Sequence, residues 1–238
     1  MSERREIVGE SSAIEAWHFL PADRRLRWGT REIITPGSVV VVDPPLELCK
    51  AGLHASVRAI DALKYGPGPV ISRVLVWGEV IRGDDKLCGQ YRKCLWMADV
   101  SEVLHRFACE AATGALDLLS ATGEAVDPRS RKAIEVKLAW LRGEATDEEL
   151  ATARADAGYA AVADAGYAAR YAARYAAMAA AMAADRAAAW DAARYAGMAA
   201  AMAAARAAAS YAAGAVVREE QDRRLADLLM ALAPMGAP

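Results

Sequence analysis

The sequence predicts an α+β fold, in which a small mixed or antiparallel sheet domain with flanking helices precedes a long alanine-rich, all-helical C-terminal region. Runs of β-branched residues bounded by glycine and proline predict the strands, and apolar residues three and four positions apart predict the helices. Alanine, the best helix former, occupies 37 of the 65 positions from 151 to 215. We therefore expect an α+β domain over 1–120, a connecting helix over 121–145 and an alanine-rich helical region over 146–238.

The strands are expected in the first of these segments. AIEAWHFL (13–20) predicts a first strand, and a turn and a second extended piece follow it. Four consecutive valines in GSVVVVDPP (37–45) predict a strand that is buried on both faces and ends at the two prolines. VISRVLVWGEVI (70–81) is the clearest strand, and RGDDK turns the chain into 87–97. We expect the following residues each to be mostly buried in one sheet: Val39, Val41, Val74, Leu75 and Val76.

Helices are expected at five places. Apolar spacing predicts a short helix over 57–65 and a longer one that begins at Ser101. Asp127 and Pro128 mark the start of the connecting helix, which Gly143 ends. Thr146, followed by three acidic residues, is a cap for a helical rod over 147–213. Leucines with four-residue ion pairs predict an amphipathic helix over 216–233.

The alanine tract contains a duplication. Residues 174–193 are followed at once by 194–213, and 16 of the 20 positions match. A helix turns by about 100° per residue, so a shift of 20 residues rotates the pattern by about 200° beyond whole turns. No single face then stays apolar, which disfavours a heptad coiled coil. A rod of this length exceeds the width of its own domain, so we expect it to fold back or to support self-association of the chain.

Composition excludes several classes of function. The net charge of −2 and the pI near 6.0 do not indicate the positively charged surface that nucleic-acid binding requires. The charged N-terminal residues lack the apolar run of a secretory signal, and no uncharged apolar stretch is long enough to span a membrane. We therefore expect a cytoplasmic protein with reduced cysteines and no membrane contact.

A basic cluster lies around DKLCGQYRK (85–93). It comprises Arg82, Lys86, Arg92 and Lys93, with Tyr91 and Trp96 between or near the charges. Such a cluster can bind phosphate or single-stranded nucleic acid. Lysine and arginine also protect exposed sheet edges, and this solvated hairpin edge is the interpretation that we adopt.

Few residues offer catalytic or metal chemistry. The histidines are His18, His54 and His105, and the cysteines lack the paired C-x2-C spacing of structural zinc sites. No glycine-rich phosphate loop and no G-x-S-x-G motif is present. We therefore expect no metal and no resident cofactor.

One order of motifs resembles the nicotinamide pocket of ADP-ribosyltransferases. WHFL is followed by GLHAS, by a helix with ALKY and by the strand RVLVWGEV. The resemblance implies an NAD-binding enzyme in which His18, Ser56 and Glu79 are catalytic. Four further residues would line the site: His54, Cys49, Lys86 and Tyr91. The simpler interpretation is that His54 and Ser56 brace the start of a helix while Glu79 is an exposed strand residue.

A second resemblance covers most of the chain. LELCKAGLHAS, GDDKLCGQYRKCLW and WLRGEATDEEL with an alanine-rich tail resemble an uncharacterised family of bacterial and phage proteins. That family implies no activity. The function that we expect is accordingly a non-enzymatic interaction or structural module whose helical tail supports self-association, and the alternative is the NAD-binding transferase.

Overall fold

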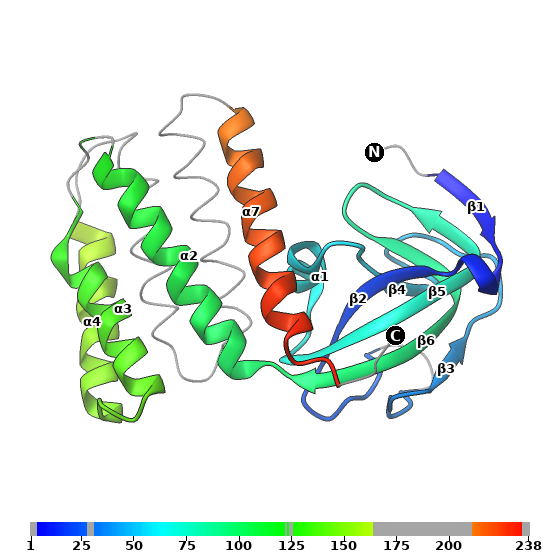
Figure 1. The fold of residues 1–238 in the computed structure, drawn as a ribbon, viewed down its shortest axis with the longest axis horizontal. Coiled ribbons are helices and arrows are strands. Elements are labelled where there is room, and N and C mark those ends of the chain that lie inside the picture. The colour runs from blue at the N-terminus through cyan, green and yellow to red at the C-terminus, as the bar shows by residue number, and fades with distance from the viewer. Residues whose placement is uncertain (1–3, 28–30, 122, 124–125, 164–210, 235–238) are drawn as a thin grey trace. The chain divides into compact units, whose positions relative to one another are not determined.

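The computed structural model describes residues 4–27, 31–121, 123, 126–163 and 211–234, and it confirms an α+β fold with an antiparallel sheet (Figure 1). The described chain forms two compact units. The first comprises residues 4–100 and 225–234, and the second contains the described residues between 101 and 224.

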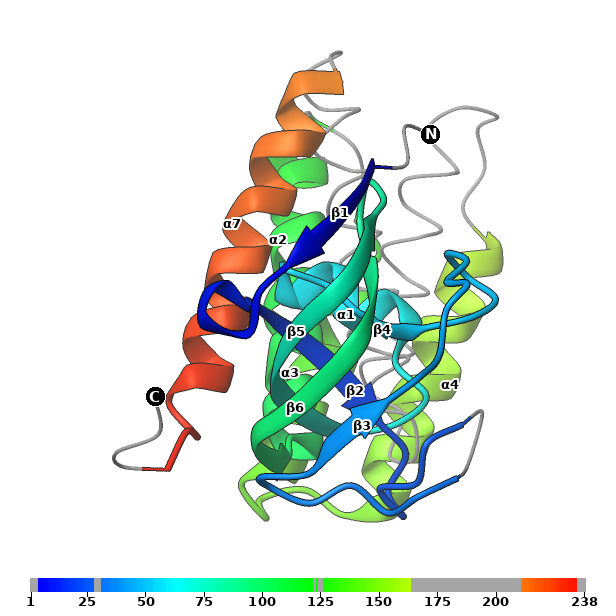
Figure 2. The same cartoon turned by 90° about the vertical axis from the view of Figure 1, so that its right-hand side faces the viewer.

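All strand pairs of the first unit are antiparallel, and two long strands organise them. β5 and β6 form the central hairpin; β1 and β2 both pair with β5, whereas β3 and β4 both pair with β6 (Figure 2). The bounds are β1 Arg4–Val8, β2 Ile14–Leu20, β3 Val39–Val41, β4 Leu53–Ala55, β5 Val70–Arg82 and β6 Leu87–Asp99. A one-turn helix, η1 (Glu10–Ser12), separates β1 from β2.

A single backbone pairing closes these strands into a ring. The amide of Trp17 donates to the oxygen of Ser56 at 2.7 Å, and the amide of Ser56 donates back at 3.0 Å. This pairing returns the order β2–β5–β6–β4 to β2. Two register shifts along the β5–β6 hairpin accompany the curl, as expected for bulges, which bend strands and increase their twist. The sheet therefore has an inner face and an outer face.

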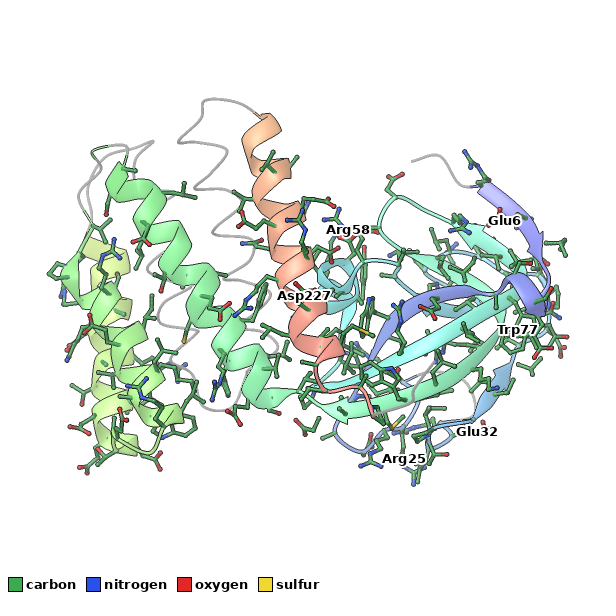
Figure 3. The ribbon with its side chains drawn as sticks, in the orientation of Figure 1. Glu6, Arg25, Glu32, Arg58, Trp77 and Asp227 are labelled. Carbon is green, nitrogen blue, oxygen red and sulfur yellow. The ribbon has the colours of Figure 1, made fainter. Side chains whose placement is uncertain are left out.

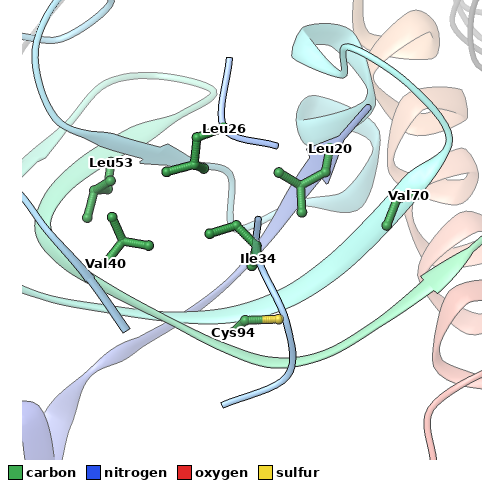
Figure 4. Packing of buried hydrophobic residues seen from close by; sticks show 7 residues of the cluster. All are labelled: Leu20, Leu26, Ile34, Val40, Leu53, Val70 and Cys94. Atoms are coloured by element: carbon green, nitrogen blue, oxygen red, sulfur yellow. The ribbon is translucent and has the colours of Figure 1, made fainter. Parts of the chain in front are cut away.

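Apolar side chains fill most of the inner face. One cluster gathers residues from five strands and from the loop that follows β2, as Figure 4 shows: Leu20, Leu26, Ile34, Val40, Leu53, Val70 and Cys94. A second cluster continues along the same face: Ala16, Ala55, Val74, Val76, Val80 and Leu87. Helix α1 (Ala59–Tyr65) follows β4, as its apolar spacing predicted.

The second unit is helical, and its helix starts match the predicted signals. Asp127 accepts a hydrogen bond from the amide of Arg129 at 2.9 Å, and proline occupies the first turn. Thr146 and Glu149 cap each other's amides, at 2.7 and 3.2 Å. The helices are α2 Ser101–Ala121, α3 Pro128–Leu141, α4 Asp147–Ala163 and α7 Tyr211–Met230, of which α7 contributes to the second unit up to Arg224.

Several expectations are corrected. The valine run forms the three-residue strand β3, in which Val39 and Val41 are 49% and 52% exposed because β3 is an edge strand and only Val40 points inward. The extended piece after β2 is reduced to an isolated pairing of Arg25 with Ile33. Strands β1 and β4 were not expected at all.

The predicted alanine-rich rod is described only at its two ends. Residues 147–163 and 211–230 are helical. The span 164–210, which holds most of the duplication, lies outside the described residues, so the long all-helical region is not supported as a whole. Within the described parts of the chain, no helix combines the length and the apolar character that crossing a membrane requires.

Candidate functional site

Polar side chains interrupt the apolar inner face at His18 and at Ser72. Side chains alternate between the faces of a strand, so His18 shares the inner face with Ala16 and Leu20, which lie two positions away on β2. Ser72 is the register partner of His18 on β5, and directly opposed residues share a face. The Ser72 hydroxyl donates to the backbone oxygen of His18 at 2.9 Å, so this hydroxyl is engaged with the backbone.

Arg92 reaches the same face from β6. Its register partners are Val40 on β3 and Val76 on β5, which both belong to the inner clusters. The side chain is only 5% exposed, and its Nη1 donates to the backbone oxygen of His54 at 2.7 Å. Burial lowers the pKa of Arg92 to about 10, so the guanidinium remains charged at neutral pH.

The guanidinium of Arg92 has no ionic partner in the described parts of the chain. None of the ion pairs among those residues includes Arg92, and its hydrogen bond to His54 is its only one there. A guanidinium carries five N–H donors. The nitrogens Nε and Nη2 are not among the fully buried atoms that lack a partner, so solvent reaches this edge of the group.

His18 is half-buried and lies on the same inner face as this positive charge. Its imidazole makes no hydrogen bond to any residue that the structure describes. Burial is the main cause that holds the pKa of His18 well below its ordinary value, and the positive charge of Arg92 and the nearby His54 add to the effect. The ring is therefore neutral at neutral pH.

The three residues suggested as catalytic are only partly brought together. Ser56 is buried, and its backbone pairs with Trp17, so by strand alternation Ser56 shares the face of Trp17 and not that of His18. Glu79 lies seven residues beyond Ser72 on β5, which corresponds to about 20 Å of extended strand. There it forms a 2.5 Å ion pair with Arg5 of β1. The structure thus places Glu79 at the opposite end of β5 from His18.

Three of the suggested site-lining residues form a group on the outer side of β4. The amide of Cys49 donates to Nε2 of His54 at 2.9 Å, and the Lys86 ammonium interacts with the Cys49 side chain. Lys86 also lies 4.0 Å from the centre of the Tyr65 ring. Burial lowers the pKa of His54, and the charges of Lys86 and Arg92 lower it further.

Tyr91 is not part of that group. Its ring stacks on Trp77, with centroids 5.3 Å apart and planes at 12°. Trp77 is labelled in Figure 3 near the region where β1 pairs with β5, since Gly78 is the register partner of Val8. Tyr91 and Trp77 therefore belong to the outer face of the sheet.

The predicted solvated cluster is wrong for Arg92. Arg82 pairs with Glu6 at 2.5 Å on the surface, but Arg92 is buried inward. A signal for this was present: Arg92 lies two positions from Cys94, a small apolar residue that is typical of a core face. Strand alternation alone could have assigned both residues to the inner face.

The remaining candidates gather no metal site. His105 and Cys109 are both buried on α2, where the His105 ring lies edge-on to Trp140 with centroids 6.3 Å apart. Within the described ranges, no group of three or more His, Cys, Asp or Glu side chains is placed to hold a metal ion. Comparison with family models, with curated proteins and with solved structures finds no match to the chain.

Proposed function

We propose that the first unit is a binding module for a small anionic group, which pairs with the guanidinium of Arg92 on the inner face beside His18. The observation that carries the proposal is a charged side chain, 5% exposed, with no carboxylate partner in the described chain. An unpaired buried charge is costly to a fold unless something compensates it. A bound anion supplies that compensation.

The free edge of Arg92 fits such a ligand chemically. Nη1 is used by the His54 oxygen, so Nε and Nη2 remain as two parallel donors. A planar pair of donors of this kind binds a carboxylate or a phosphate group through two hydrogen bonds. The neutral imidazole of His18 adds one donor or one acceptor next to this edge.

Calorimetric titration of the full chain tests the proposal. The probes are sulfate, inorganic phosphate, acetate and NAD, each titrated at constant ionic strength. We expect at least one oxyanion to bind, Arg92→Gln to weaken that binding at least tenfold, and Arg92→Lys to weaken it less because the charge remains while the planar fork is lost.

Arg73→Gln is the matched control. Arg73 lies on β5 but faces outward, where it pairs with Glu15 at 2.5 Å and lies 4.5 Å from the centre of the Trp17 ring. This variant should bind the anion as the unmodified chain does. Equal binding by Arg92→Gln and the unmodified chain, with near-ultraviolet circular dichroism showing both to be folded, would contradict the proposal.

The NAD-dependent transferase is the alternative enzymatic function. Its support is that Ser56 pairs through its backbone with Trp17, the neighbour of His18 in the chain. Its requirement for Glu79 is opposed by the ion pair with Arg5 at the other end of β5. Consumption of NAD by the purified chain, lost in Glu79→Gln, would favour the enzyme over the binding module.

Self-association through the C-terminal helix is the second part of the proposal. Val216 and Met230 of α7 are 66% and 46% exposed, and we propose that these apolar side chains contact a second copy of the chain. Sedimentation velocity of the full chain over a hundredfold concentration range tests this. We expect an increase in average mass that Val216→Ser reduces; a monomer at every concentration would overturn it.

A further inference from the structure

We infer that anion binding at Arg92 is coupled to protonation of His18, so that the site prefers doubly charged oxyanions of the sulfate or phosphate type and binds them more tightly as the pH falls. This inference rests on the proposed function. Its geometric basis is that the two side chains project from β2 and β6 onto one inner face, with no described carboxylate paired to the guanidinium.

The groups that act on His18 are few. Arg92 on β6 and His54 on β4 both disfavour a charged imidazole, and Ser72 on β5 faces it with a neutral hydroxyl that is engaged with the backbone. No carboxylate of a described residue is among the groups that shift the titration of His18. The free site therefore carries one positive charge, on Arg92.

An anion on the free edge of Arg92 changes this balance. The anion offsets the positive charge of Arg92, which opposes protonation of His18. It also brings negative charge close to the imidazole. His18 then takes a proton from solvent onto its unprotonated ring nitrogen and becomes a second donor for the anion. By linkage, a ligand that raises the proton affinity of His18 must itself bind more tightly at lower pH, by the same factor.

The charge of the loaded site selects the class of ligand. With His18 protonated, two positive charges face the ligand, and a dianion interacts with both more strongly than a monoanion of similar size. Sulfate and formate are suitable probes, because neither changes its own charge between pH 5.5 and 8.0. A pH effect on their binding therefore reports the protein.

Titration of the full chain with each probe, at constant ionic strength and at several pH values between 5.5 and 8.0, tests the coupling. We expect the apparent Kd for sulfate to fall by about tenfold from pH 8.0 to pH 5.5, and the Kd for formate to fall less. His18→Gln should bind sulfate with nearly constant affinity over this range. Nuclear magnetic resonance of the imidazoles should show that sulfate raises the pKa of His18 more than those of His54 and His105.

The outcomes separate the two proposals. If sulfate binds through Arg92, as its loss in Arg92→Gln would show, but with the same affinity at every pH, the coupling is wrong and the anion site stands. If His18→Gln keeps the full pH dependence, the coupling is also wrong. If sulfate and formate fail to bind at any pH, both this inference and the proposed oxyanion site fall.

Discussion

Nη1 of Arg92 donates a 2.7 Å hydrogen bond to the backbone oxygen of His54, while the imidazole of the same His54 accepts the amide of Cys49 at 2.9 Å. One residue of β4 thus contacts the charged group on the inner face through its backbone and the loop of Cys49 through its side chain. Because His54 is held from both sides, the position of the Arg92 guanidinium depends on the packing of the outer loop. Residues far apart in sequence fix this relationship.

The ligand-free chain should lose stability as the pH falls from 7.5 to 5. His18 is held neutral in the folded chain, whereas in the unfolded chain it titrates near pH 6.5. Its stabilising contribution is therefore complete above about pH 6.5 and is lost as the pH falls towards the lower folded pKa, with a slope of at most about 1.4 kcal/mol per pH unit.

Urea unfolding at a series of pH values measures this slope. His18→Gln should make the decline shallower, but His54, whose pKa is lowered too, should keep part of it. Equal slopes for the variant and the unmodified chain would show that His18 is not held neutral by the fold.

Cys49 should be the fast-reacting thiol. It is exposed, whereas Cys88, Cys94 and Cys109 are buried, and burial raises the pKa of Cys94 to about 11 and that of Cys109 to about 12. Since the thiolate is the reactive species, these buried groups should react slowly at pH 8. We expect one rapid equivalent with a chromogenic disulfide reagent, none in Cys49→Ser, and all four thiols after unfolding in guanidinium chloride. Two or more rapid equivalents in the folded chain would contradict this prediction.

The elements with strong local signals could be predicted from the sequence. The strands β2, β5 and β6 carry long β-branched or apolar runs, and the starts of α3 and α4 carry side chains that cap their own backbones. Such signals act over a few residues, so a single sequence contains them.

The missed elements depend on pairing with distant residues. β1 (RREIV) is largely exposed and charged, and it is a strand because β5 offers it a free edge. β4 has only three residues, and its place follows from pairing with β6 and from the Trp17–Ser56 closure. The inward position of Arg92 is fixed by its pairing with Val40 and Val76, although its alternation with Cys94 on β6 was a local signal for it.

Removal of the Thr146 cap should destabilise the second unit. The Thr146 hydroxyl accepts the amide of Glu149 at 3.2 Å, and the Glu149 carboxylate accepts the amide of Thr146 at 2.7 Å. The Thr146 amide and the Thr146 hydroxyl both donate to the Glu149 carboxylate and hold the pKa of that carboxyl below its ordinary value. Thr146→Ala loses the hydroxyl and should lower the free energy of unfolding by about 1 kcal/mol. Thr146→Ser keeps the oxygen and should unfold like the unmodified chain in a denaturant titration followed by far-ultraviolet circular dichroism; a loss of the same size in both variants would disprove the capping role.

Two glycines should respond to alanine with opposite signs. A Cβ at Gly89 of β6 would lie 2.2 Å from Cγ1 of Val76, a fully buried side chain of the inner face. Gly89→Ala must therefore push β6 away from β5 or displace Val76, at a cost of about 1–3 kcal/mol. Gly114 lies within α2, and a Cβ there meets nothing within 4 Å.

Gly114→Ala should accordingly stabilise the chain by about 0.5–1 kcal/mol, the difference in helix propensity between the two residues. Thermal unfolding of the two variants tests both signs. The double variant Gly89→Ala with Val76→Ala identifies the cause at β6: if the clash with Val76 is responsible, the double variant loses less stability than the two single losses added together. Simple additivity would show that the clash with Val76 does not cause the loss of stability in Gly89→Ala. The close approach of β6 to β5 at Gly89 would then not limit the packing of the inner face.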